Sequence, residues 1–119
     1  MKSIEIISIP VTDQERAKDF YVNKLGFQLV ADNAMSEKQR WVQVALPGGG
    51  ATLTLVTWFE QMPAGCIRGL VVGTDDIEKE MELLQSKGAE LGKIDETPWG
   101  RFLSVKDPDG NVLSLHQKN

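Results

Sequence analysis

The C-terminal stretch of the chain alternates between apolar and polar residues in the way that two paired β-strands do. A tight turn over 107–110 (Asp-Pro-Asp-Gly) separates the strands, because proline sets φ, aspartate caps the local backbone and glycine accepts a positive φ. Leucines occupy one face of the second strand, and the other face carries Val112, Ser114 and His116. The pattern therefore predicts a hairpin with one face in the hydrophobic core and one face that could line a solvent-accessible cavity.

The pattern upstream of this hairpin predicts two helices and several more strands. Strands are expected over 4–11, 27–31, 41–46 and 51–58, and again over 67–72 and around Leu91. The first helix begins at Thr12 or Asp13, either of which suits an N-cap, and ends at Gly26. The second helix begins at Thr74-Asp75 and ends at Gly88, and each helix has apolar residues at helical spacing.

The two halves of the chain share one order of elements, β-α-β-β-β. A single shift of register places the caps, stops and core leucines of the first half on those of the second: Thr12, Asp13, Gly26 and Leu29 on Thr74, Asp75, Gly88 and Leu91. Such matches are typical of an internal duplication. We therefore expect one α+β domain over 1–119, with module one over 1–59, a linker over 60–65 and module two over 66–119.

Strand alternation predicts which residues face the helices and which face away. Either half, at about 60 residues, would bury only about 60% of its unfolded surface, so we expect the modules to join, with their helix-free faces curving around a shared cleft like a cup. The helix-facing set is Ile7, Ile9, Leu53, Leu55, Leu70, Val72, Leu113 and Leu115. The cleft-facing set is Ile6, Ser8, Thr52, Thr54, Ile67, Gly69, Ser114 and His116, joined by Trp41 with Gln43 and Phe102 with Ser104.

Composition and charge limit the classes of binding partner that the chain is expected to have. The chain has 119 residues, of which 41% are hydrophobic, and a net charge of −4. Nucleic-acid-binding proteins usually carry a basic face, so this acidic balance argues against such a partner. No apolar run is long enough to span a bilayer, and no secretion signal is evident. With Cys66 as its single cysteine the chain forms no internal disulfide, and we expect a cytoplasmic protein.

The paired β-α-β-β-β order, with Asp-Pro-Asp-Gly before the last strand, resembles the vicinal oxygen chelate superfamily, which includes glyoxalase I, bleomycin-resistance proteins and extradiol dioxygenases. The motifs that carry the resemblance are Asp19-Phe20-Tyr21, Leu25-Gly26-Phe27 and the run from Pro98 to Phe102. The resemblance implies the cup-shaped fold of that superfamily and a homodimer. It leaves the reaction open, because one fold hosts many chemistries.

Enzymes of this superfamily hold a divalent metal with one side chain from each of four strands. In this sequence the resemblance places those four positions at Ile6, Thr54, Gly69 and Ser114. Metals of this kind are bound by imidazole nitrogen or carboxylate oxygen, and none of these residues supplies either group. The sequence therefore predicts no metal site of the usual kind and favours the bleomycin-resistance-like branch.

Aromatic and cationic side chains near the hairpins are candidate ligand contacts. Rings at a cleft mouth stack on flat or cationic ligands, and the alternative is that they fill the core or a subunit interface. Arg101 is either a contact for an anionic group or half of a surface ion pair. The expected ligand-binding residues are Trp41, Gln43, Thr54, Trp99, Arg101, Phe102, Ser104, Ser114 and His116.

The single histidine is the only candidate for acid–base catalysis. Its ordinary pKa suits proton transfer near neutral pH, but His116 also lies near the C-terminus, where it is equally explained as a solvated strand end. Two hypotheses follow. The protein binds or sequesters an aromatic or cationic organic compound without a metal, or it is an enzyme of the same superfamily, such as a lyase, isomerase or transferase, with an atypical or absent metal site.

Overall fold

A computed structural model describes all 119 residues of the chain. Module one consists of β1 (Ile6–Pro10), α1 (Gln14–Asp19), a π-helical turn η1 (Phe20–Lys24), β2 (Gln28–Ala34), β3 (Arg40–Ala45) and β4 (Thr52–Val56). Its four strands lie in the order β1-β4-β3-β2, with β1 parallel to β4 and the other pairs antiparallel.

Module two repeats this arrangement. It consists of β5 (Leu70–Gly73), α2 (Ile77–Ser86), β6 (Glu90–Leu91), β7 (Asp95–Thr97), β8 (Gly100–Lys106) and β9 (Val112–Gln117). The order is β5-β9-β8-β6, and β7 pairs with the start of β8. The α+β fold class with two β-α-β-β-β modules is confirmed; the short strand β7 was not predicted.

The two helices begin at aspartate caps, one of them a residue later than expected. Asp13 caps α1, and its side chain accepts a hydrogen bond from the backbone N–H of Arg16 over 3.1 Å. For α2 the cap is Asp76, which accepts from the N–H of Lys79. The prediction of Thr74-Asp75 was wrong because the Thr74 hydroxyl accepts from the N–H of Asp76 and forms a local turn that precedes the helix.

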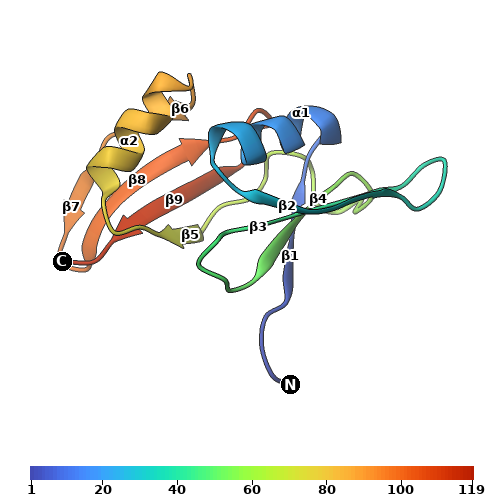
Figure 1. Ribbon diagram of the computed structural model, residues 1–119, viewed down its shortest axis with the longest axis horizontal. Helices are drawn as coiled ribbons and strands as arrows, with labels where there is room; N and C mark the ends of the chain where they lie inside the picture. The colour runs from blue at the N-terminus through green and yellow to red at the C-terminus, as the bar shows by residue number, and fades with distance from the viewer.

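The predicted helix-facing residues lie on the inner side of the sheets. A single cluster of buried apolar side chains includes residues of both modules, among them Ile9, Leu53, Leu55, Val105 and Leu113, and the helical side chains Ala17, Tyr21 and Leu84. Figure 1 shows module one on the right and module two on the left, with α1 and α2 both on the upper side. The faces that bear Ser8, Thr54 and Ser114 lie on the opposite side of their sheets.

A polar contact joins the modules at one end of this core. The fully buried Asn111 donates to the carbonyl of Pro10 over 2.9 Å and accepts from the N–H of Ile67 over 3.0 Å. Its side chain also donates to Asp107, so the 107–110 turn is tied both to β1 and to the segment that precedes β5. The Asp-Pro-Asp-Gly turn and the asparagine that follows it thus connect the two halves of the chain.

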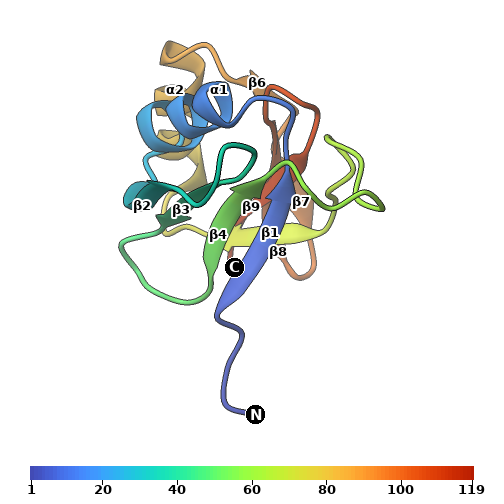
Figure 2. The same ribbon diagram turned by 90° about the vertical axis from the view of Figure 1, so that its right-hand side faces the viewer.

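The two sheets remain separate in the single chain, because β1 and β5 are edge strands that pair only with β4 and β9. Figure 2 shows β1 and β4 in front of β8 and β9, with the N-terminal residues extending beyond β1. Neither α1 nor α2 has the length and apolar character of a transmembrane helix.

Candidate functional site

A chain of hydrogen bonds crosses the helix-free face of module one. The Trp41 indole N–H donates to Oε1 of Gln43 over 3.1 Å, and Nε2 of Gln43 donates to Oγ1 of Thr52 over 2.8 Å. The Thr52 hydroxyl in turn donates to the carbonyl of Glu5. Because both ends of the Gln43 amide are engaged, its orientation is set by the protein before any ligand arrives.

Two hydroxyls continue this polar face toward β1. Thr54 lies opposite Gln43 in the β3–β4 ladder and opposite Ser8 in the β1–β4 ladder, so all three side chains share one face. The hydroxyls of Ser8 and Thr54 are 3.2 Å apart and hydrogen-bonded. The buried Thr54 therefore keeps its polar group satisfied without a metal or a charge.

An aromatic platform, defined here as Trp41, Trp58 and Phe59, adjoins this polar face. The Trp41 and Trp58 rings stack with centroids 6.4 Å apart and planes 24° apart, and Phe59 lies 6.1 Å from Trp58. Phe59 is 47% exposed, so part of the platform is open to solvent. Sequence reasoning placed Trp41 here but missed Phe59, whose signal was a second aromatic residue directly after Trp58, just before the polar linker.

The helix-free face of module two carries its own row, Phe102, Ser104, Ser114 and His116. The β8–β9 register sets Phe102 opposite His116 and Ser104 opposite Ser114, so the predicted alternation is present. The His116 ring stacks on Phe102, with centroids 4.5 Å apart, and its Nε2 lies 2.8 Å from the carbonyl oxygen of Trp99. Nε2 donates that bond, which leaves it unable to accept a proton from a substrate.

Trp99 and Arg101, which flank this row, lie in different surroundings. The Trp99 side chain is 78% exposed at the turn between β7 and β8. Arg101 has the opposite parity to Phe102 and lies on the helix side, where it donates to Glu78 of α2 over 2.7 Å. The structure thus places Arg101 in an ion pair, away from the Phe102 row.

The two polar faces lie in different modules, and neither Trp41 nor Gln43 lines the hollow that His116 borders. None of the five principal cavities of the chain is lined by residues of both faces. His116 borders a shallow hollow with residues of β5 and the chain end, whereas Trp41 and Gln43 border none of the five. Each module presents half of the expected cleft.

The four positions of the superfamily's metal ligands do not fit a metal here. Ile6 and Thr54 lie in module one, and Gly69 and Ser114 lie in or beside the sheet of module two. Their side chains provide alkyl carbon, two hydroxyls and a hydrogen atom, which is a poor donor set for a divalent cation. No group of three or more His, Cys, Asp or Glu side chains is arranged to hold a metal.

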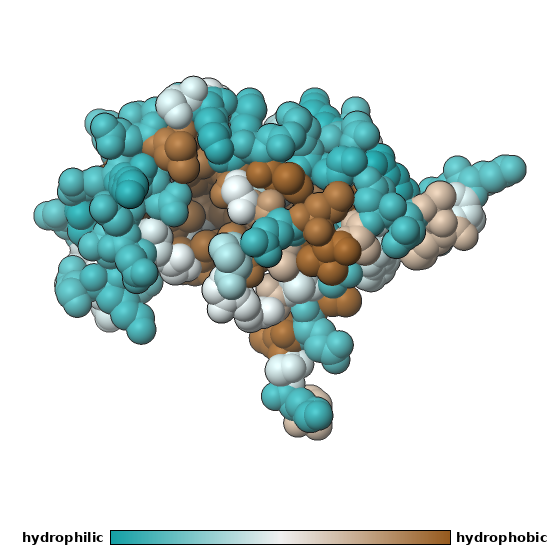
Figure 3. Space-filling model, in the orientation of Figure 1, coloured by the Kyte–Doolittle hydropathy of each residue, from teal (hydrophilic) through white to brown (hydrophobic).

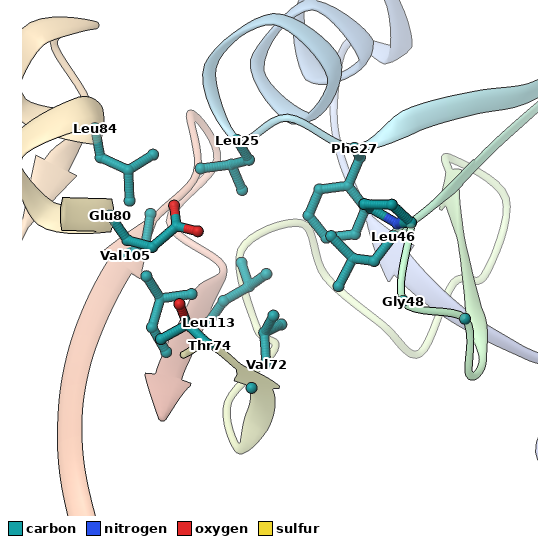
Figure 4. Close-up of a pocket in the computed structure, with 14 residues that line it drawn as sticks. Leu25, Phe27, Leu46, Gly48, Val72, Thr74, Glu80, Leu84, Val105 and Leu113 are labelled. Atoms are coloured by element: carbon teal, nitrogen blue, oxygen red, sulfur yellow. The ribbon is translucent and has the colours of Figure 1, made fainter. Parts of the chain in front are cut away.

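A separate cavity of about 390 Å³ lies between the modules on the helix side. Figure 3 shows apolar residues gathered around this hollow, and Figure 4 shows Leu25, Phe27 and Leu46 facing Leu84 and Leu113 across it. Sequence reasoning missed the cavity, because its two walls come from different modules and depend on how they pack.

Comparisons with solved structures find close matches of fold and sequence. TnmS3, an antibiotic binding protein from Streptomyces sp. CB03234, is 44% identical, with a TM-score of 0.95 over 100% of this chain and 98% of that one. A glyoxalase/bleomycin resistance protein from the same Streptomyces is 47% identical, with a TM-score of 0.88 over 97% of this chain and 100% of the other.

Sequence comparisons agree with the structural ones. The uncharacterized protein YetH of Bacillus subtilis is 33% identical over 98% of this chain and 99% of its own length. The family model described as Glyoxalase/Bleomycin resistance protein/Dioxygenase superfamily matches residues 3–115. The chain therefore belongs to the glyoxalase/bleomycin resistance protein/dioxygenase superfamily.

Proposed function

We propose that this protein binds and sequesters a planar aromatic or cationic organic compound without the help of a metal. The observation that carries the proposal is the aromatic platform beside a polar face whose hydrogen bonds are already set. Stacking on indole rings provides affinity for flat or cationic rings, and the oriented Gln43 amide and the hydroxyls provide a few directional contacts. The similarity to TnmS3, described as an antibiotic binding protein, supports binding over catalysis.

The surroundings of His116 also favour binding. The His116 ring is held in place because its Nε2 donates to the Trp99 carbonyl and Phe102 covers one face of the ring, which leaves Nδ1 as an acceptor for a ligand. His116 is therefore assigned a contact role, together with Trp99 and Phe102. The unsuitable donor set at the four metal positions removes the Lewis-acid step that the enzymes of this superfamily use.

We further propose that the working form is a cytoplasmic homodimer whose clefts are shared. Both β1 and β5 leave one row of backbone groups unpaired, which is a common basis for association between chains. Exposed apolar side chains accompany these edges, namely Ile4, Ile6 and Val71. Pairing of β1 with the β5 strand of a second copy would place the module-one face beside the module-two row of that copy.

The test uses two fluorescent probes of similar planar shape, the cation proflavine and the neutral acridone. Fluorescence anisotropy titrations compare wild type with Trp41→Ala, and Met35→Ala serves as the control because Met35 is an exposed apolar residue outside both faces. Loss of a stacking ring is expected to weaken binding at least tenfold, which corresponds to about 1.4 kcal/mol. The control is expected to leave affinity unchanged.

The same titrations test whether binding needs a metal, and analytical ultracentrifugation tests the oligomeric state. Affinity is expected to be equal with EDTA and with added zinc, nickel or manganese. Analytical ultracentrifugation is expected to show a dimer. Unchanged binding in Trp41→Ala would refute the platform, and retention of stoichiometric metal after purification would refute the metal-independent mechanism.

A further inference from the structure

The cavity between the modules lies on the other side of the sheets from the proposed binding faces. Its walls include Val105, Leu113 and Leu115, which alternate with the Ser104, Ser114 and His116 of the module-two row. A ligand in this cavity would not touch the aromatic platform. The cavity is therefore a separate feature of the molecule, independent of the function proposed above.

The cavity lies at the end of the module interface that is remote from the polar contacts of the 107–110 turn. The polar contacts of Asn111 and Asp107 close the interface near the 107–110 turn. At the far end, the loop after β3 (Leu46 to Gly49) faces the start of α2 and the end of β5 without filling the space between them. Core side chains that are otherwise almost fully buried, such as Leu84 and Leu113, form part of its wall.

One charged group reaches into this apolar space. Glu80 lies on α2 one turn before Leu84, and Figure 4 shows its carboxylate pointing into the cavity among Leu25, Leu84 and Val105. Its neighbour Glu78 is paired with Arg101, whereas no Lys, Arg or His side chain lies within ion-pair distance of Glu80. The Thr74 hydroxyl at the edge is a second polar group.

We propose that this cavity is a second binding site, for a compact organic cation that joins an apolar body to an ammonium or amidinium group. A volume of about 390 Å³ is within the range of small-ligand pockets, which combine apolar walls with a few polar groups that fix orientation. The apolar side chains of the walls contact the apolar body of the ligand, and the Glu80 carboxylate pairs with its ammonium or amidinium group. A charge-assisted contact next to apolar walls is stronger than the same contact in open water.

The test uses three rigid probes that share one apolar body and carry a positive, a neutral or a negative polar group: adamantylamine, adamantanol and adamantane carboxylate. Methyl NMR titrations follow the leucine and valine signals of Leu84, Val105 and Leu113 in the full-length protein. Adamantylamine is expected to shift these signals and to bind about tenfold tighter than adamantanol, with the carboxylate weakest.

Two matched variants isolate the carboxylate. Glu80→Gln is expected to remove the preference for the amine while leaving adamantanol binding within about twofold, because the apolar walls are unchanged. Glu82→Gln, an exposed site on the same helix, is expected to keep the preference. Equal affinity of the three probes, or shifts confined to the Ser114 face, would overturn the proposal.

A second copy of the chain is the competing occupant of this hollow. In that case the second copy would keep adamantylamine out of the hollow, and the Leu84, Val105 and Leu113 signals of the dimer would not shift, a result that would also overturn the proposal. Proflavine titrations in the presence of saturating adamantylamine separate this site from the aromatic platform. Unchanged proflavine affinity is expected, and either site can then fail its own test without affecting the other.

Discussion

The Tyr21 hydroxyl donates a buried hydrogen bond of 2.9 Å to Oδ2 of Asp107, which joins the π-helical turn η1 of module one to the 107–110 turn of module two. The carboxylate also accepts from the backbone N–H groups of Asp109 and Asn111 and from the Asn111 side chain. Two motifs that mark the superfamily in the sequence, Asp-Phe-Tyr and Asp-Pro-Asp-Gly, are therefore partners in space.

Removal of this hydroxyl is expected to destabilise the fold without changing its packing. Tyr21→Phe keeps the ring that packs edge-on against Phe20 and Phe27 but leaves the buried Asp107 with one donor fewer. The free energy of unfolding at neutral pH should fall by about 1–2 kcal/mol. Urea denaturation measures the change, and an unaltered midpoint would contradict the assigned bond.

The Tyr21 contribution should also depend on pH. Burial, and then the nearby Asp107 carboxylate, raise the pKa of Tyr21 well above its usual value. The unfolded chain releases this proton near pH 10 while the folded chain retains it, so the stabilisation is complete below about pH 10 and declines as pH rises further. The stability gap between wild type and Tyr21→Phe should therefore shrink between about pH 10 and pH 11. A constant gap over that interval would show that the hydroxyl titrates normally in the folded state.

Asp32 is expected to show the opposite pH dependence. Arg40 contacts both carboxylate oxygens over 2.7 Å and Lys18 lies 2.8 Å away, and these two cations, Arg40 foremost, hold the pKa of Asp32 below its usual range. Asp32→Asn should lower stability by about 1 kcal/mol at neutral pH, a modest value because the side chains are partly exposed.

This Asp32 contribution should be lost in acid. It is present above the ordinary carboxyl pKa of about 4 and declines as pH falls below that value, where only the folded state still releases the proton. Thermal unfolding at pH 7 and at about pH 3 checks the trend. Glu37→Gln, in the exposed loop between β2 and β3, is the control and should change stability little at either pH. An Asp32→Asn cost that persisted unchanged in acid would rule out the ion pair as its source.

Two glycines with nearly the same backbone angle should differ in their tolerance of alanine. Gly65 has φ of +87° and Gly49 has φ of +86°, so both substitutions carry the strain of a left-handed residue, about 1–2 kcal/mol. A Cβ at Gly49 meets nothing, whereas a Cβ at Gly65 would collide with the backbone carbonyl of Asp109. Gly65→Ala should therefore cost more than Gly49→Ala, by about 2 kcal/mol in chemical denaturation. Equal costs would mean that the linker is able to move away from the 107–110 turn.

Much of the fold was predictable because its signals are local. Alternation placed Ile9, Leu55 and Leu113 on the helix side, and the register of the strands confirms it. The cap of α2 was misplaced by one residue, since Thr74, Asp75 and Asp76 are all good capping residues and only the local turn at Thr74 leaves Asp76 as the cap. The strand β7 was missed because it has only three residues, all of them polar, and because it forms only by pairing with β8.

The candidate site was predictable residue by residue but not as an assembly. Parity set Trp41, Gln43 and Thr54 on one face and Phe102, Ser104, Ser114 and His116 on another, as the ladders confirm. Whether these residues bind a ligand stays a prediction. Parity places Arg101 on the face opposite to Phe102, where its guanidinium pairs with Glu78 of α2, so of the two expectations for Arg101 the structure shows the ion pair.

The sequence by itself determined the repeated β-α-β-β-β order and the two faces of each sheet, because both depend on residue type and on spacing within a strand or helix. Only the tertiary structure decided how the modules meet: Tyr21 against Asp107, Asn111 between Pro10 and Ile67, and an apolar cavity with Glu80 inside it. These contacts join residues distant in the chain, and no local pattern encodes the relative placement of two packed modules.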